Sequence, residues 1–222
     1  MRNYDFVALA LLVGRPTLET LYMTAASTLL ASALGFPVGV LLRATDADGI
    51  APRRALNAVL SRTVNLLRSF PFIILMILVF PLSRVLVGTS IGTTAAIVPL
   101  SIAAAPFVAR VVESALKEVD PGVVLAARSM GSTPAQIVAK VLVPEALPSL
   151  VAGLSLTIIN LIAYSAMAGA IGGGGLGDLA IRYGYQRFRT DVMIAAVAVI
   201  VILVESVQLA LAALSRRLLA KR

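Results

Sequence analysis

The sequence predicts an all-α integral membrane protein with five transmembrane helices. Hydrophobic residues make up 59% of the 222 residues, 14% are charged, and the mean hydropathy is +0.96. Soluble domains carry roughly 25% charged residues, so this composition points to a membrane protein. A helix needs about 20 apolar residues to cross a bilayer. The stretches of about that length are residues 17–42, 63–80, 92–114, 150–171 and 191–214.

The first residues differ from a cleavable signal peptide. Their apolar run, residues 6–13, is short, Asp5 offsets the charge of Arg2, and no small-residue cleavage site precedes Pro16. We expect an uncleaved interfacial segment that leads into the first span.

Prolines and charged residues fall inside or beside the predicted spans. Each proline should kink its span, because proline removes a backbone hydrogen bond, and the kinks serve either bundle packing or hinges around a pathway; these residues are Pro37, Pro71, Pro99 and Pro106. Arg68 and Arg110 lie near the cytoplasmic ends of their spans, where snorkelling to the headgroups is the ordinary explanation. Glu205 lies well inside the last span. Such a carboxylate is either functional or a paired structural residue, and we favour the structural interpretation.

The distribution of basic residues predicts the orientation. With the N-terminus outside, twelve Lys and Arg residues fall in the inside regions and six in the outside regions. Because basic residues accumulate on the cytoplasmic side, we expect the N-terminus outside and the C-terminus in the cytoplasm. The net charge of +8 is explained by the same accumulation of basic residues in the cytoplasmic loops. It is scattered through short loops without a basic patch, so we expect no nucleic-acid partner.

A soluble-looking segment, residues 119–150, separates the third and fourth spans. Asp120 can cap a helix that begins at Pro121, and Gly131 suits a left-handed end. Apolar residues recur at helical spacing between them. A first short helix is therefore predicted.

A second short helix should follow at once. Thr133, Pro134 and Gln136 form the pattern of a capping box with proline at the first position. Pro144 and Pro148 are expected to end this helix. The two helices together predict a compact helix-turn-helix on the cytoplasmic membrane surface.

This loop resembles the signature loop of the permease subunits of bacterial ABC importers. The resemblance rests on Ala126, Ala127, Gly131, Ile137, Leu147 and Pro148. It implies the type I permease fold, with one permease domain over residues 1–222 and a cytoplasmic coupling loop at 119–148. In that family the loop docks into a groove on the ATPase subunit. The residues implied to couple are Val123, Val124, Leu125, Ala126, Ala127, Arg128, Met130, Gly131, Glu145 and Pro148. Leu125 stands where the family usually carries glutamate.

Longer segments are similar to the permeases of methionine importers: residues 69–92, 95–116, 132–148 and 164–177. This resemblance implies a homodimer with the fourth span on its axis, and a gate at Tyr164, Ser165 and Met167. It also implies two ATP-binding subunits, an extracytoplasmic substrate-binding protein, a small amino-acid substrate and the lipid of the bacterial inner membrane.

No catalytic, cofactor or metal site is expected. The chain has no Cys or His and no GxxxxGK[ST] motif, so another chain must bind ATP. The GxGxxG pattern within residues 172–177 follows a membrane span and not a strand, which favours closely packed or flexible backbone over a dinucleotide site.

Other functions stay open. One is an ABC permease for another small amino acid. A second is an ion-gradient-driven secondary transporter that uses Glu205, although it leaves the cytoplasmic helix pair unexplained. An intramembrane enzyme ranks last, because nearly every carboxylate lies outside the spans.

Overall fold

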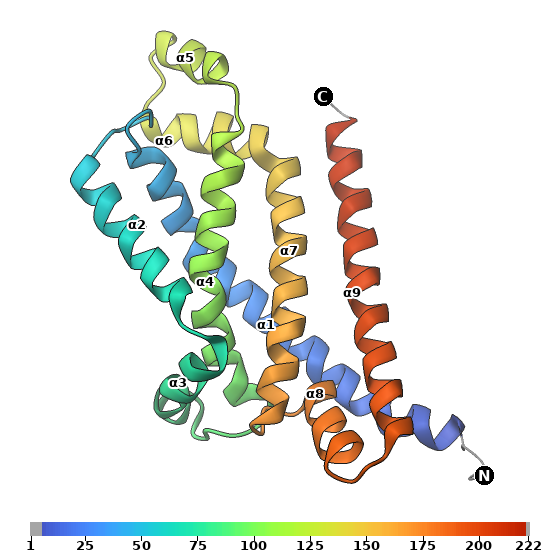
Figure 1. The fold of residues 1–222 in the computed structure, drawn as a ribbon. Helices are drawn as coiled ribbons and strands as arrows, with labels where there is room; N and C mark the ends of the chain where they lie inside the picture. Colours follow the sequence, from blue (N-terminus) through green and yellow to red (C-terminus); the bar gives the residue numbers. More distant parts are fainter. Residues whose placement is uncertain (1–5, 221–222) are drawn as a thin grey trace.

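The regular elements of the chain are all helical across residues 6–220, which the computed structural model describes. Long helices run along the molecule, with the N-terminus at one end and the C-terminus at the other (Figure 1). The elements are α1 (Phe6–Thr45), α2 (Arg54–Ser69), α3 (Phe72–Val87), α4 (Thr93–Lys117), α5 (Pro121–Ser129), α6 (Pro134–Ile137), the π-helical turn η1 (Val138–Leu142), α7 (Val143–Ala170), α8 (Gly175–Leu179), the π-helical turn η2 (Ala180–Tyr185) and α9 (Thr190–Leu219).

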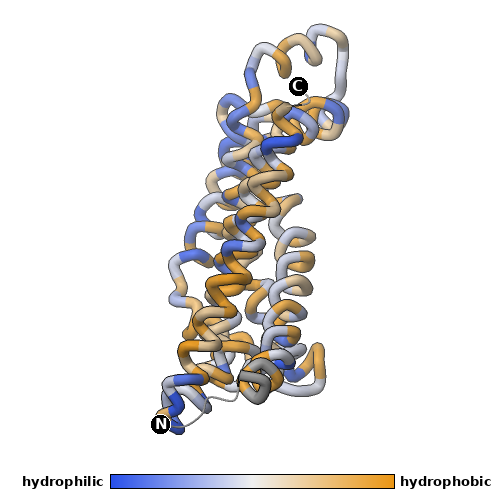
Figure 2. Tube along the Cα trace, turned by 90° about the vertical axis from the view of Figure 1, so that its right-hand side faces the viewer, coloured by the Kyte–Doolittle hydropathy of each residue, from blue (hydrophilic) through white to orange (hydrophobic). Residues whose placement is uncertain are grey.

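Four of the predicted spans are confirmed as long apolar helices. α1, α4, α7 and α9 contain them, and each is long and apolar enough to cross a bilayer. Apolar residues dominate the length of the bundle, and hydrophilic residues lie at its two ends and along one side of the half that carries the C-terminus (Figure 2).

The second span is not the continuous helix that we expected. α2 and α3 meet at an angle of 103° and pass the length and hydropathy test of a span only together. Pro71 causes the break, because it restricts Phe70 to an extended backbone with ψ of 130°. The predicted kink is therefore a full interruption of the helix.

The segment expected to lead into the first span is helical and continuous with that span. α1 runs without interruption from Phe6 and includes Pro16. In an apolar environment backbone groups must be paired within the segment, which favours continuing a helix through a proline. Residues 1–5 lie outside the described part of the chain.

Pro144 and Pro148 do not end the second loop helix, contrary to expectation. The helical path runs from Pro134 to Ala170, so this helix and the fourth span are one unit. The π turn η1 lies directly before Pro144, and there the Val143 amide donates to the Val138 carbonyl, five residues back. This wider turn accommodates a residue without an amide hydrogen.

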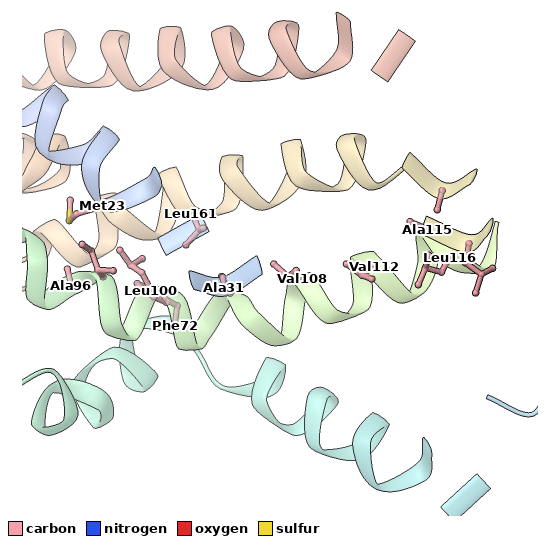
Figure 3. Packing of buried hydrophobic residues seen from close by; sticks show 14 of the residues in the cluster. Met23, Ala31, Phe72, Ala96, Leu100, Val108, Val112, Ala115, Leu116 and Leu161 are labelled. Carbon is pink, nitrogen blue, oxygen red and sulfur yellow. The ribbon is translucent and has the colours of Figure 1, made fainter. Parts of the chain in front are cut away.

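α1 and α4 pack very closely along a pair of glycines. A Cβ atom on Gly35 would lie 2.4 Å from the Ala105 carbonyl oxygen, and one on Gly39 would lie 2.5 Å from that of Ala109. Such a GxxxG spacing lets two backbones approach in a membrane. The buried side chains beside this contact come from α1, α3, α4 and α7 (Figure 3).

An ionic network joins α4 to α1 at the end that carries the loop. The Lys117 ammonium donates to Asp46 at 2.8 Å and to Glu113 at 2.9 Å. The hydrogen bond from Lys117 lowers the pKa of the Asp46 carboxyl below its ordinary value. Arg110 donates to Glu113 at 2.6 Å and, on α2, to the Ser61 hydroxyl at 2.6 Å. Snorkelling therefore does not describe Arg110, which ties α2 to α4.

The glycine-rich run forms the turn between α7 and α8 at the opposite end. Its backbone is closely packed, as one of the two interpretations predicted. A Cβ on Gly177 would lie 2.2 Å from the Ala166 carbonyl oxygen. Glu19 and Thr20 of α1 accept hydrogen bonds from the amides of Gly175 at 3.0 Å and Leu176 at 2.9 Å. These contacts fix the end of α7 that carries the predicted gate.

Candidate coupling surface and gate

α5 begins and ends through the caps that the sequence predicts. The Asp120 carboxylate accepts a hydrogen bond from the Gly122 amide at 2.7 Å. At the other end Gly131 has φ of +78°, and the next amide, of Ser132, donates to the Ala127 carbonyl at 3.1 Å. This is the pattern of a Schellman motif. The caps fix the length of α5 and the direction in which its side chains point.

The loop presents apolar side chains to solvent. Leu125 is 66% exposed and Met130 is 79% exposed. Large exposed apolar groups outside a membrane span mark interaction sites. We give the name coupling surface to the exposed residues without a polar side chain among those predicted to couple: Val123, Leu125, Ala126, Met130 and Gly131.

Other predicted coupling residues contact the rest of the chain, although Arg128 is also exposed. Ala127 is only 3% exposed and packs into the main core, and Val124 is half-buried against that core. The Arg128 guanidinium donates to the Gly49 carbonyl at 3.0 Å, which ties α5 to the α1–α2 connection. These three residues hold the loop in place.

The second loop helix supplies a rigid continuation into the membrane. The capping box is present: the Gln136 amide donates to the Thr133 hydroxyl at 3.4 Å, and the Thr133 amide donates to the Gln136 side chain at 2.9 Å. Pro148 is buried, and its carbonyl accepts from the Ser215 hydroxyl at 3.1 Å.

Glu145 lies apart from the coupling surface in an acidic cavity. This exposed residue lines a hollow of about 290 Å³ together with Glu118 and Asp120. The Ser149 hydroxyl donates to Glu118 at 2.5 Å in the same place. A patch of this charge suits a basic partner surface.

The three predicted gate residues lie in different environments. The Tyr164 ring stacks on Phe72 of α3 with centroids 4.4 Å apart. Ser165 is buried and its hydroxyl donates to the Ile162 carbonyl at 2.7 Å. Met167 is 48% exposed. Only Met167 therefore presents its side chain to a surface where a second subunit could meet it.

Met167 belongs to a stripe that follows α7. The exposed residues of this helix beyond its first two turns recur at helical spacing and are mostly small: Ala152, Leu156, Ala163, Met167 and Ala170. A narrow stripe of small residues allows close helix approach in a membrane.

α2 is strongly amphipathic, which the sequence analysis missed. Polar residues recur at three- and four-residue spacing along one face: Arg54, Ser61, Asn65 and Arg68. The opposite face exposes Leu56, Val59 and Leu66. The signal was the helical spacing of these polar residues. It was hidden because the expected span began only at residue 63.

A cavity of about 240 Å³ lies where α2, α3, α4 and α7 meet. Arg68 and Asn160 line it beside Tyr164 and other aromatic groups. Arg68 lies over the Phe107 ring, 5.9 Å from its centroid. Phe107 lies in the middle of α4, so the Arg68 guanidinium is beside the centre of that helix and does not extend toward the headgroups as snorkelling would require. The full lining is Leu67, Arg68, Phe70, Phe72, Leu75, Ala103, Phe107, Asn160 and Tyr164.

Glu205 lies on the exposed face of α9, and no ion pair holds it within the described part of the chain. Across residues 6–220, no three His, Cys, Asp or Glu residues are grouped so that they could hold a metal ion.

Comparison with known families identifies the class of this chain. Residues 35–220 match the family described as the binding-protein-dependent transport system inner membrane component. The chain belongs to this family. It is thus an inner-membrane, multi-pass permease, as the resemblance of the loop implied.

Relatives of this permease carry a more specific name. It is 51% identical over 201 residues to the probable D-methionine transport system permease protein MetI of Vibrio cholerae, covering 90% of this chain and 89% of the relative. It is 52% identical over 158 residues to the D-methionine transport system permease protein MetI of Escherichia coli K12, covering 71% and 73% of the two chains.

Solved structures agree with the fold. A chain of the MetNI methionine ABC transporter in an inward-facing conformation superposes with a TM-score of 0.93 at 47% identity, covering 95% of the permease and 98% of that chain. A chain of an amino acid ABC transporter solved with histidines has a TM-score of 0.80 at 21% identity, which supports the fold alone. The permease therefore has the type I ABC importer fold that the sequence predicted.

Proposed function

We propose that this permease is the membrane-spanning subunit of an ATP-driven methionine importer. The identity of 51% to a D-methionine permease over nine tenths of the chain carries this proposal. The chain is not itself the enzyme: ATP hydrolysis belongs to a separate subunit, because the sequence has no nucleotide-binding motif.

The coupling surface docks on that ATPase subunit. Its apolar residues protrude past the ends of the long helices, at the end of the molecule where the C-terminus lies (Figure 1). The second loop helix and α7 form one unit, so a movement of the loop is carried directly into the membrane. Glu145 and its acidic neighbours add a contact for basic residues of the ATPase.

Two copies of the permease form the pathway between them. The exposed stripe on α7 supports a two-fold contact, since C2 dimers are the commonest homo-oligomers. Met167 on this stripe closes the pathway, because a flexible thioether can seal and repack. Tyr164 and Ser165 position that part of α7 through their packing and hydrogen bond.

The polar face of α2 is turned away from the lipid: Ser61 and Asn65 bond Arg110 of α4, and Arg68 lines the cavity between these helices. Polar groups are tolerated in a membrane bundle where they are paired or line a cavity. The exposed apolar face of α2, with Leu56, Val59 and Leu66, faces the lipid instead.

The single permease domain spans residues 1–222 with the N-terminus outside and the C-terminus in the cytoplasm. This orientation puts the loop at 119–148 on the ATP side. A substrate-binding protein delivers the amino acid from the opposite side, where the turn between α7 and α8 lies (Figure 1).

A variant at Glu205 separates this function from an ion-driven transporter. Glu205→Gln should leave methionine uptake unchanged in cells that express the complete transporter, because the importer draws energy from ATP. Loss of uptake in that variant, with the permease still inserted at a normal level, would favour the secondary transporter.

A second measurement tests the substrate. A bacterial strain that can neither synthesise nor import methionine should grow on D-methionine when it receives this permease with its ATPase and binding protein. Growth only on a different amino acid would assign the permease to another substrate.

A further inference from the structure

The cavity where α2, α3, α4 and α7 meet holds polar groups that the chain leaves unpaired. Within residues 6–220, neither the Arg68 guanidinium nor the Asn160 amide makes a side-chain hydrogen bond or ion pair; Arg68 has only its contact with the Phe107 ring at 5.9 Å. The Tyr164 hydroxyl also has no partner there. Its ring is held instead by stacking on Phe72.

This cavity lies deep in the membrane part of the bundle. Phe107 is ten residues from Lys117, the end of α4 beside the coupling loop. At 1.5 Å per residue it lies about 15 Å below that end. Leu67, Arg68 and Phe70 are exposed, so the cavity opens on the surface of the bundle at this depth. An unpaired arginine within the membrane part of a protein indicates a function by default.

Arg68 and Arg110 show the difference between a structural and an available arginine. Arg110 is fully engaged by Glu113, Ser61 and Asn65 across α2 and α4. Arg68 lies on the same polar face of α2, at the last turn before the break at Phe70. Its planar group of N–H donors matches a carboxylate, which it can bind through two hydrogen bonds.

The rest of the lining is apolar and aromatic. Phe72, Leu75, Ala103 and Phe107 surround the polar groups. A ligand that satisfies the whole cavity has a carboxylate, a neighbouring polar group that can pair with Asn160 and Tyr164, and an apolar side chain. The volume of about 240 Å³ limits it to a small molecule.

We propose that this cavity binds one molecule of an α-amino acid with an apolar side chain on its way through the membrane. The carboxylate pairs with Arg68, the ammonium with Asn160 and Tyr164, and the side chain lies against Phe72, Leu75 and Phe107. This proposal rests on the import function proposed above, and it gives each permease subunit one substrate site that opens on its surface.

Photolabelling tests the location of the ligand. The probe is a methionine analogue with a diazirine in its side chain, added to the purified permease–ATPase complex without the binding protein. Labelled peptides should map to residues that line the cavity, chiefly Leu75 and Phe107. Excess methionine or norleucine should suppress the label. Methioninol, which lacks the carboxylate, should reach the same suppression only at a concentration at least about tenfold higher. Labelling elsewhere, no labelling, or equal competition by methioninol would overturn the proposal.

Substitution of the arginine tests its role. Arg68→Gln should weaken competition by methionine about 10- to 100-fold, since it removes a charged hydrogen-bonded pair. It should also abolish the preference for methionine over methioninol. Arg62→Gln is the matched control, because Arg62 is an exposed arginine of the same helix, as Arg68 is, but does not line the cavity. An unchanged preference in Arg68→Gln would overturn the assignment.

Two further measurements keep the outcomes distinct. If Arg68→Gln does not assemble with the ATPase, the comparison of methionine with methioninol on the unaltered complex still tests whether the cavity recognises a carboxylate. Methionine uptake by the unaltered complex is measured in parallel. Uptake without cavity labelling would refute this proposal alone, whereas absence of uptake of any amino acid would refute the import function itself.

Discussion

Replacing Gly131 with glutamate should separate the permease from its ATPase while leaving it folded. Gly131 has φ of +78°, and a Cβ added there would meet nothing within 4 Å. The folding cost is therefore backbone strain alone, about 1–2 kcal/mol. Against a typical folding free energy of about 5–15 kcal/mol, this leaves the chain folded.

The effect on docking should be larger. Gly131 follows Met130 directly on the coupling surface, so the new carboxylate would be placed in an apolar contact. An unpaired charge in such a contact costs several kcal/mol. About 3 kcal/mol corresponds to a loss of roughly 100-fold in affinity for the ATPase.

Gly88→Glu is the matched control. Gly88 has φ of +84°, and a Cβ there also meets nothing within 4 Å. It ends α3, at the opposite end of the bundle from α5 (Figure 1). It therefore carries the same strain and charge without touching the coupling surface.

The assay is co-purification of the ATPase, with ATP-driven methionine uptake measured at equal permease levels. Gly131→Glu should lose both, and Gly88→Glu should keep the bound ATPase. If the two variants retain the ATPase equally, the assignment of the coupling surface is wrong.

Three further predictions concern topology, the dimer axis and the helix core. Reporter domains fused after Asp48 and after Gln186 should report the cytoplasm and the outside, respectively, and the reverse result would refute the orientation. A cysteine at Met167, introduced into this cysteine-free chain, should crosslink two subunits; a monomer under conditions in which the complex is intact would place α7 away from the axis. Gly39→Leu should abolish extractable, monodisperse protein at a cost above about 3 kcal/mol, because its Cβ would lie 2.6 Å from that of Val112. Gly14→Leu on the same helix, where nothing lies within 4 Å, should be neutral, and equal yields would contradict the packing argument.

Local signals in the sequence were reliable where neighbouring residues determine the structure. The Asp120 cap, the Thr133 capping box and the left-handed Gly131 each depend on a few consecutive residues. The same holds for the long apolar helices, whose burial in a bilayer needs only composition and length.

Prolines were not predictable in the same way. Pro71 interrupts its span, whereas Pro144 lies within a continuous helical path. The difference is in the preceding turn: Phe70 is extended, while a π turn precedes Pro144. Packing of the surrounding helices selects between these outcomes, and a single sequence does not contain that information.

The cavity was missed because its residues are far apart in the chain. Arg68, Phe107 and Asn160 come from three helices, and each has an unremarkable local sequence. The polar stripe of α2 was a usable signal for one of them. The close contact at Gly35 and Gly39 was likewise visible as a GxxxG spacing but was not recognised.

Transport by the purified components tests the central claim most directly. Proteoliposomes that contain this permease and its ATPase, with the binding protein outside, should accumulate labelled methionine only when ATP is enclosed. A proton or sodium gradient alone should produce no accumulation. Uptake driven by a gradient in the absence of the ATPase would contradict the account, because the permease would then carry its own energy coupling.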